Sequence, residues 1–117
     1  MGKLTPEEKR EKALEKRLNS LKKTRESQLK TLSRNVDQCR KRADSLDKKG
    51  RDVYAKITEA QRELSIASTQ AKRNSLQGKI QRLTSQFNSY KRQYQSAINS
   101  QNSFLNRYRE LSNRPLM

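Results

Sequence analysis

Pairs of acidic side chains at helical spacing come nearest to a catalytic or metal-binding arrangement in this sequence. Asp44 and Asp47 are three residues apart and Glu59 and Glu63 are four apart, so each pair would share one face of a helix. General acid–base chemistry uses carboxylates of this kind. Lys and Arg residues stand at the same spacing, however, and they favour ordinary ion pairs on a solvated helix face. We therefore expect no catalytic residue among them.

The remaining reactive residue types are almost absent. The 117-residue chain has no histidine, which removes the commonest general base and a common metal ligand. Its one cysteine, Cys39, cannot form an intrachain disulfide or build a thiolate metal site, and it favours a reducing compartment. Gly50 and Gly78 are isolated, so no glycine-rich phosphate loop exists. We predict a non-enzyme without metal or cofactor.

Lys and Arg dominate the composition and give a net charge of +16. Such an excess implies an anionic partner, which is an acidic protein surface, nucleic acid or anionic lipid. From Leu64 to Arg109 no acidic residue occurs, and Ser, Asn and Gln are frequent. The residues expected to contact an anionic partner are Arg40, Lys41, Arg42, Lys48, Lys49, Arg51, Lys72, Arg73, Lys91 and Arg92.

The run CRKR at residues 39–42 resembles the DNA-reading region of basic leucine zippers, with Asn35 as the reading asparagine. That family places an arginine eight residues after the asparagine, where this chain has Ala43. The positions that should carry zipper leucines include Ala60 and Ala67, which are too small for a stable parallel zipper. The resemblance covers about eight residues and fails at its defining spacing.

The apolar residues alternate in steps of three and four, which predicts coiled-coil helices. The first helix should begin after Thr5, which can cap it, with Pro6 at the first helical position. The last helix should end near Asn113, because Pro115 disfavours helix just before it. Only 30% of the residues are hydrophobic, which is too few for a globular core. The expected fold class is therefore all-α.

Two arrangements satisfy this rhythm. One is a single long helix in an intermolecular coiled coil, favoured because the rhythm passes Gly50 without losing phase. The other is an antiparallel two-helix coiled-coil hairpin bent near Gly50, with helices over residues 5–49 and 52–113 and a turn at 50–51. Lys48 and Lys49 before Gly50 form a good helix stop. The apolar rhythm is interrupted near Arg25 and after Ala71, and the hairpin would place these two interruptions side by side. We predict this hairpin, as a single elongated helical unit over residues 1–117.

The arms of such a hairpin are unequal, so residues 96–117 would overhang. Apolar residues in this overhang would have no partner within the chain, and an unpaired apolar stripe normally marks a partner surface. We therefore expect docking to a protein partner, or self-association, through Ile98, Phe104, Leu105, Tyr108 and Leu111.

These features predict a basic structural or assembly protein that docks on acidic surfaces within a larger complex. In outline it resembles the small stalk proteins of bacterial secretion and flagellar export machines, and minor structural proteins of virus particles. The alternative is a non-sequence-specific DNA- or RNA-binding or packaging protein. Membrane binding is not favoured, because a broad bulky apolar face is lacking. Without a signal-peptide pattern or an apolar run long enough to span a bilayer, we expect an intracellular protein or one within an assembled particle.

Overall fold

The computed structural model describes residues 2–117, and these form two helices and no strand. Helix α1 spans Pro6–Ile66 and helix α2 spans Gln70–Asn113. The chain divides into two compact units. The hairpin unit is Asp37–Gln101 and holds the second half of α1, the turn and most of α2. The terminal unit joins the described residues up to Val36 with Asn102–Met117.

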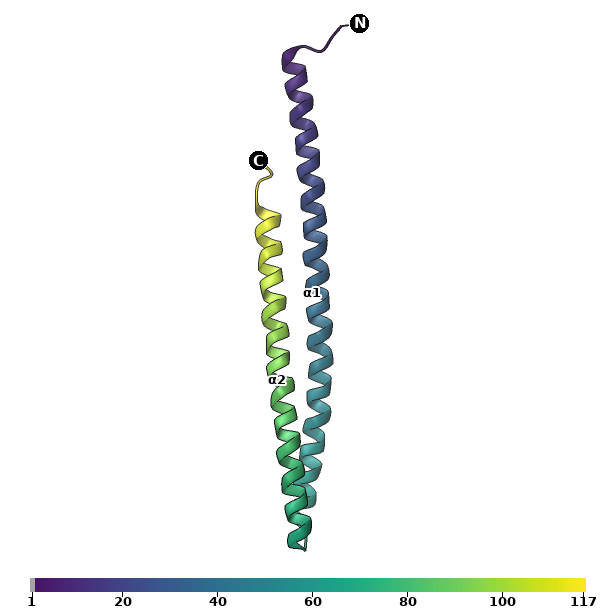
Figure 1. Ribbon diagram of the computed structural model, residues 1–117, viewed down its shortest axis with the longest axis vertical. Helices are drawn as coiled ribbons and strands as arrows, with labels where there is room; N and C mark the ends of the chain where they lie inside the picture. The colour runs from purple at the N-terminus through teal and green to yellow at the C-terminus, as the bar shows by residue number, and fades with distance from the viewer. Residues whose placement is uncertain (1) are drawn as a thin grey trace. The chain divides into compact units, whose positions relative to one another are not determined.

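In the hairpin unit, α1 and α2 run antiparallel and lie side by side along their length (Figure 1). Their contact surface contains Ala43 and Leu46 from α1 and Ala97 from α2, which form one buried cluster. Tyr90 and Ile98 pack against this cluster. The predicted all-α, two-helix hairpin is thus confirmed.

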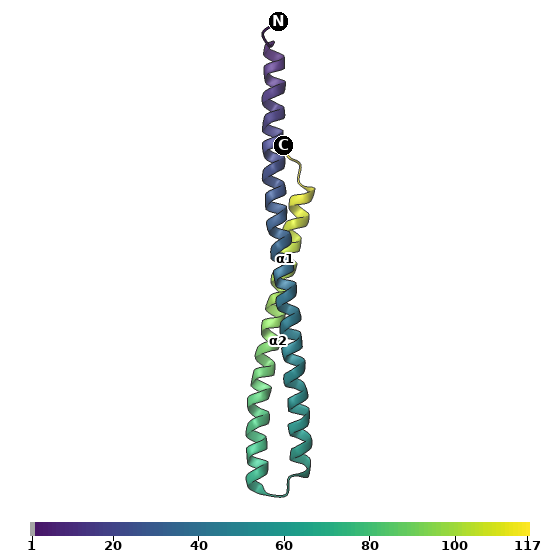
Figure 2. The same cartoon turned by 90° about the vertical axis from the view of Figure 1, so that its right-hand side faces the viewer.

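Residues 67–69 make the connection between the helices, which is a short loop in Figure 2. Thr69 caps α2, because its Oγ1 accepts a hydrogen bond from the Lys72 amide at 3.2 Å. The Ala67 amide donates to the Leu64 carbonyl at 3.3 Å, and the Ala67 carbonyl accepts from Arg73 Nε at 3.0 Å. Among residues 2–117 none has a positive φ, so the turn needs no glycine.

The predicted turn at residues 50–51, and with it the helix bounds 5–49 and 52–113, is wrong. Gly50 lies inside α1 and is buried. It occupies one position of the buried series that steps by three and four along α1: Ala43, Leu46, Gly50, Val53, Ile57 and Ala60. A glycine within a helix costs only about 1 kcal/mol relative to alanine, which a continuous buried seam readily offsets. Residues on the two sides of the predicted bend, such as Ala43 and Ile57, therefore lie on the same helix.

The buried seam of the hairpin unit is narrow and rich in small side chains. Ala43, Ala60 and Ala97 are only 2%, 1% and 4% exposed, whereas no large side chain of the described residues falls below 2%. Small residues let two backbones approach closely, and Leu46, Ile57 and Leu76 are also buried, at 6–7% exposed, whereas larger side chains farther from the centre of the seam are less covered. Leu83 and Phe87 are accordingly only half-buried.

The predicted apolar overhang at residues 96–117 is also wrong. Ala97 and Ile98 pack in the core cluster of the hairpin unit. In the terminal unit, Leu111 and Leu32 line the same groove. The cause is the position of the turn: with the connection at residues 67–69, α2 has 44 residues and α1 has 61. In the terminal unit it is the beginning of α1 that is exposed, through residue 17.

The ends of both helices agree with the sequence signals. Thr5 Oγ1 accepts a hydrogen bond from the Glu8 amide at 3.2 Å, and α1 begins at Pro6 as predicted. Helix α2 ends at Asn113, two residues before Pro115. Within the part of the chain that the structure describes, neither helix has an apolar stretch long enough to cross a bilayer.

Candidate functional site: a basic surface and an aromatic groove

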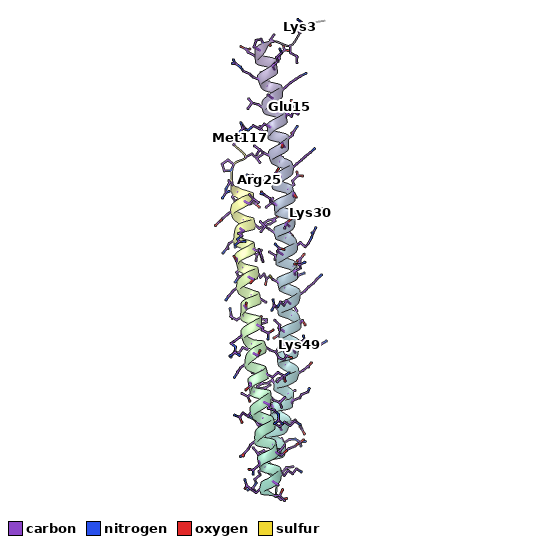
Figure 3. The ribbon with its side chains drawn as sticks, viewed as in Figure 1. Lys3, Glu15, Arg25, Lys30, Lys49 and Met117 are labelled. Atoms are coloured by element: carbon purple, nitrogen blue, oxygen red, sulfur yellow. The ribbon has the colours of Figure 1, made fainter. Side chains whose placement is uncertain are left out.

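Six of the residues expected to contact an anionic partner form a basic cluster along α1, away from the turn. Its side chains are all exposed, and Lys49 points away from α2 (Figure 3). Carboxylates on the same helix partly neutralise this cluster. Arg40 pairs with Asp37 at 3.5 Å, and Arg51 pairs with Asp47 at 3.1 Å. The members of the cluster are Arg40, Lys41, Arg42, Lys48, Lys49 and Arg51.

Helix α2 carries cations without carboxylate partners. The three ion pairs found among residues 2–117 all lie within α1. No acidic residue occurs between Glu63 and Glu110, so nothing on α2 within the hairpin unit offsets its positive charge. We call the exposed Lys and Arg side chains of this segment the α2 cations: Lys72, Arg73, Lys79, Arg82, Lys91 and Arg92. They spread over several faces of the helix rather than forming one stripe.

Of the acidic pairs, Glu59 has an arginine partner. Its Oε1 lies 2.8 Å from Arg62 Nη2, and this hydrogen bond lowers the pKa of Glu59 and raises the pKa of Arg62. The described residues contain no group of three metal-ligating side chains. Asp44, Asp47 and Glu59 are exposed on α1, and Glu63 is half-buried.

An aromatic groove lies between the two helices of the hairpin unit. It has a volume of about 310 Å³. Tyr54 and Phe87 stand across it with ring centroids 5.8 Å apart and ring planes inclined by 48°. Tyr54 is 60% exposed and Tyr94 is 36% exposed, so ring surface faces solvent. The residues that line the groove are Leu46, Asp47, Gly50, Arg51, Tyr54, Phe87, Tyr90, Lys91 and Tyr94.

Gly50 explains why a hollow forms at this level of the seam. It occupies a buried position of α1 but has no side chain to fill the space opposite α2. A Cβ built on Gly50 would lie 3.9 Å from Phe87 Cε2. The missing side chain leaves room between the four aromatic rings, and most larger residues at this position would occupy that room.

A second hollow, of about 520 Å³, adjoins the aromatic groove on α2. It shares Lys91 and Tyr94 with the groove and adds Arg92 together with the amide side chains of Asn88 and Gln95. An aromatic hollow and a cationic, amide-lined hollow thus lie next to each other. The two together offer flat apolar surface on one side and hydrogen-bond donors with positive charge on the other.

The residues predicted to dock a partner have mixed surroundings. Ile98 packs against the buried cluster of the hairpin unit, and Leu111 lines a groove together with Leu32, so neither lies on the predicted overhang; docking through them stays a prediction. In the terminal unit, Phe104 and Leu105 are half-buried, and Arg107 lies 5.7 Å from the Phe104 ring centroid. Tyr108 is 36% exposed. For Phe104, Leu105 and Tyr108, docking stays a prediction.

No protein-family model, curated protein or solved structure matches this chain. Its function has to be argued from the α2 cations and the aromatic groove. The three- and four-residue spacing of Phe87, Tyr90 and Tyr94 indicates packing residues and does not single out Tyr54. The signal that would have located the groove is the glycine at a seam position, because a seam without a side chain leaves a hollow.

Proposed function

We propose that this chain is a non-enzymatic assembly protein that docks through α2 of its hairpin unit on an acidic surface of a partner within a larger complex. The observation that carries the proposal is the set of exposed α2 cations on a helix without a carboxylate before Glu110. Unpaired Lys and Arg side chains keep their full charge for a partner, whereas those beside carboxylates are partly neutralised.

The proposal assigns no catalytic role, because the chain lacks histidine and its acidic side chains sit among Lys and Arg. It also distinguishes the two helices. Helix α1 of the hairpin unit has carboxylates beside its cations, including the pairs of Asp37 and Asp47. Partner docking should therefore depend on α2 more than on total charge.

Two variants with the same loss of charge test this dependence. In the first, Lys72, Lys79, Lys91 and Arg92 of α2 become Gln; Arg73 is kept because it supports the turn. In the second, Arg40, Lys48, Lys56 and Arg62 of α1 become Gln. Binding of labelled polyglutamate is measured by fluorescence anisotropy from ~50 to ~200 mM salt. We expect the α2 variant to lose at least about tenfold more affinity at each salt concentration. Equal losses would show that net charge alone governs binding and would reject the proposal.

Non-specific nucleic-acid binding is the second candidate function. The specific observation in its favour is the aromatic groove, since exposed tyrosine rings beside cations suit bases and phosphates together. A polyanion without bases would use the α2 cations but gain nothing from the rings. This difference allows the two functions to be separated by experiment.

A further inference from the structure

We infer that the aromatic groove of the hairpin unit is a binding site for single-stranded nucleic acid, in which an unstacked base lies against the tyrosine rings and its phosphate meets Lys91 and Arg92. The inference rests on the second candidate function, nucleic-acid binding, and names the partner as a single strand that meets the same α2 cations.

The aromatic rings of the groove provide the surface against which a base would lie. Four of the six aromatic residues of the chain line this one groove, and two of them, Tyr54 and Tyr94, expose a substantial part of their surface. Tyr54 and Phe87 contact each other with their planes inclined by 48°, so a flat ligand would lie against the exposed surface of Tyr54 and Tyr94 rather than between Tyr54 and Phe87. A groove of about 310 Å³ falls at the lower end of the range for small-molecule sites, roughly 300–1,000 Å³, which suits a single base.

The side chains beside the groove provide the positive charge that a phosphate would meet. Lys91 borders both hollows, Arg92 lines the cationic one, and neither has a carboxylate partner. Asp47 is the one acidic residue in the groove, and Arg51 neutralises it at 3.1 Å. A phosphate placed beside the aromatic groove therefore meets net positive charge. The amides of Asn88 and Gln95 in the same hollow can donate to phosphate oxygens or to base edges.

The site suits a single strand better than a free nucleotide or a duplex. The other α2 cations continue beyond the groove along a helix that has no carboxylate before Glu110, so a flexible strand that follows the helix can meet several of them. A base in a duplex has both faces covered by its neighbours and cannot lie against a tyrosine without being unstacked. A flexible single strand can turn a base toward the rings at little cost.

Three ligands of comparable charge test the inference on the intact chain. A labelled oligothymidylate of about 12 nucleotides is compared with an abasic oligonucleotide of equal length and with polyglutamate. We expect the intact strand to bind about 5- to 150-fold more tightly than the abasic strand, the range typical of one stacked base. The chain has no Trp, so its fluorescence reports tyrosine alone, and only the intact strand should quench it.

Matched variants locate the effect. Tyr94→Leu and Tyr54→Leu should each weaken binding of the intact strand by about fivefold or more and leave the abasic strand unaffected. Tyr108→Leu is the control, because Tyr108 is also 36% exposed on α2 but belongs to the terminal unit, outside the groove. Tyr94→Phe keeps a ring and should retain most of the affinity. Circular dichroism confirms that each variant is folded.

The inference is overturned if the abasic strand binds as tightly as the intact one, if Tyr94→Leu behaves like Tyr108→Leu, or if thymidine monophosphate binds as tightly as the strand. Failure of the proposed function looks different: the α2 and α1 charge variants would then bind polyglutamate equally. Tight polyglutamate binding that depends on the α2 cations, with no difference between the two strands, would retain the docking function and reject the nucleic-acid site.

Discussion

Gly50 of α1 and Phe87 of α2 face each other across a gap that fits one methyl group, since a Cβ on Gly50 would lie 3.9 Å from Phe87 Cε2. This is an ordinary van der Waals distance. Gly50→Ala should therefore stabilise the chain by about 0.5–1 kcal/mol, because alanine is the better helix former and adds a contact. Urea unfolding followed by circular dichroism measures the change. A glycine at a left-handed turn would give the opposite result, so destabilisation would contradict the continuous α1 helix.

The cap at Thr69 should contribute measurably to stability. Replacing it with Ala leaves the Lys72 amide without its 3.2 Å hydrogen bond and should cost about 1 kcal/mol, whereas Thr69→Ser should retain most of the stability. Thr58→Ala is a matched control on α1, since the Thr58 hydroxyl bonds only to the Tyr54 carbonyl of its own helix. That change should leave the free energy of unfolding unchanged or raise it. Equal effects at both threonines would argue against a turn at residues 67–69.

The small side chain of Ala97 should be required where it meets Ala43. The two residues are 4% and 2% exposed within one cluster, so Ala97→Leu should overpack it and cost about 1–3 kcal/mol. Ala71→Leu places the same side chain at an exposed position of α2 and should change stability by less than about 0.5 kcal/mol. Thermal unfolding of both variants provides the comparison. A harmless Ala97→Leu would restore the overhang predicted from sequence.

The native cysteine offers a direct measurement of the pairing register. Cys39 lies about one helical turn from Ala43 along α1, and Gln101 lies one turn from Ala97 along α2; both are half-buried in the hairpin unit. Gln101→Cys should therefore form an intramolecular disulfide with Cys39 under mild oxidation, seen as a shift in non-reducing electrophoresis that reductant reverses. Ala60→Cys is the control, because a bend at Gly50 would bring residue 60 to Cys39. Crosslinking through residue 60 instead would overturn the register.

The ion pair of Glu59 with Arg62 should be visible in titration. The hydrogen bond from Arg62 lowers the pKa of Glu59, so the carboxylate stays charged to a lower pH than usual. Because the folded-state pKa is depressed, the pair's stabilising effect is present above the unfolded-state pKa and is lost as the pH falls through the folded-state pKa. Carboxyl NMR of Glu59 should show its pKa rising in Arg62→Gln. An unchanged value would exclude the pair in solution.

The hairpin was predictable from the sequence, but the place of its turn was not. Gly50 carried the strongest local stop signal, yet it fell on a seam position, and burial along the seam outweighed that signal. The true turn at residues 67–69 uses a threonine cap and no positive φ, so it lacks the glycine or proline that marks most turns. In the sequence this turn is marked only by the interrupted apolar rhythm near Ala71. The hairpin bent near Gly50 accounted for that interruption by placing it beside the irregularity near Arg25.

The candidate site was likewise predictable only in part. Composition and the absence of acidic residues from Leu64 to Arg109 predict an anionic partner from the sequence alone. The aromatic groove was not predictable, because Tyr54 reaches Phe87 only when the turn is placed at residues 67–69. A wrong turn shifts every contact between the helices. The predicted pairing register and the predicted apolar overhang were therefore wrong together.

The three-residue connection also bears on how the hairpin unit assembles. Closing a short loop costs little chain entropy, so the first contacts between the helices should form beside Thr69 and then extend away from it. Gly50 and Phe87 lie several helical turns from that starting point. The aromatic groove should therefore appear late in folding, and nascent chains still emerging from the ribosome would lack it until most of α2 has been synthesised.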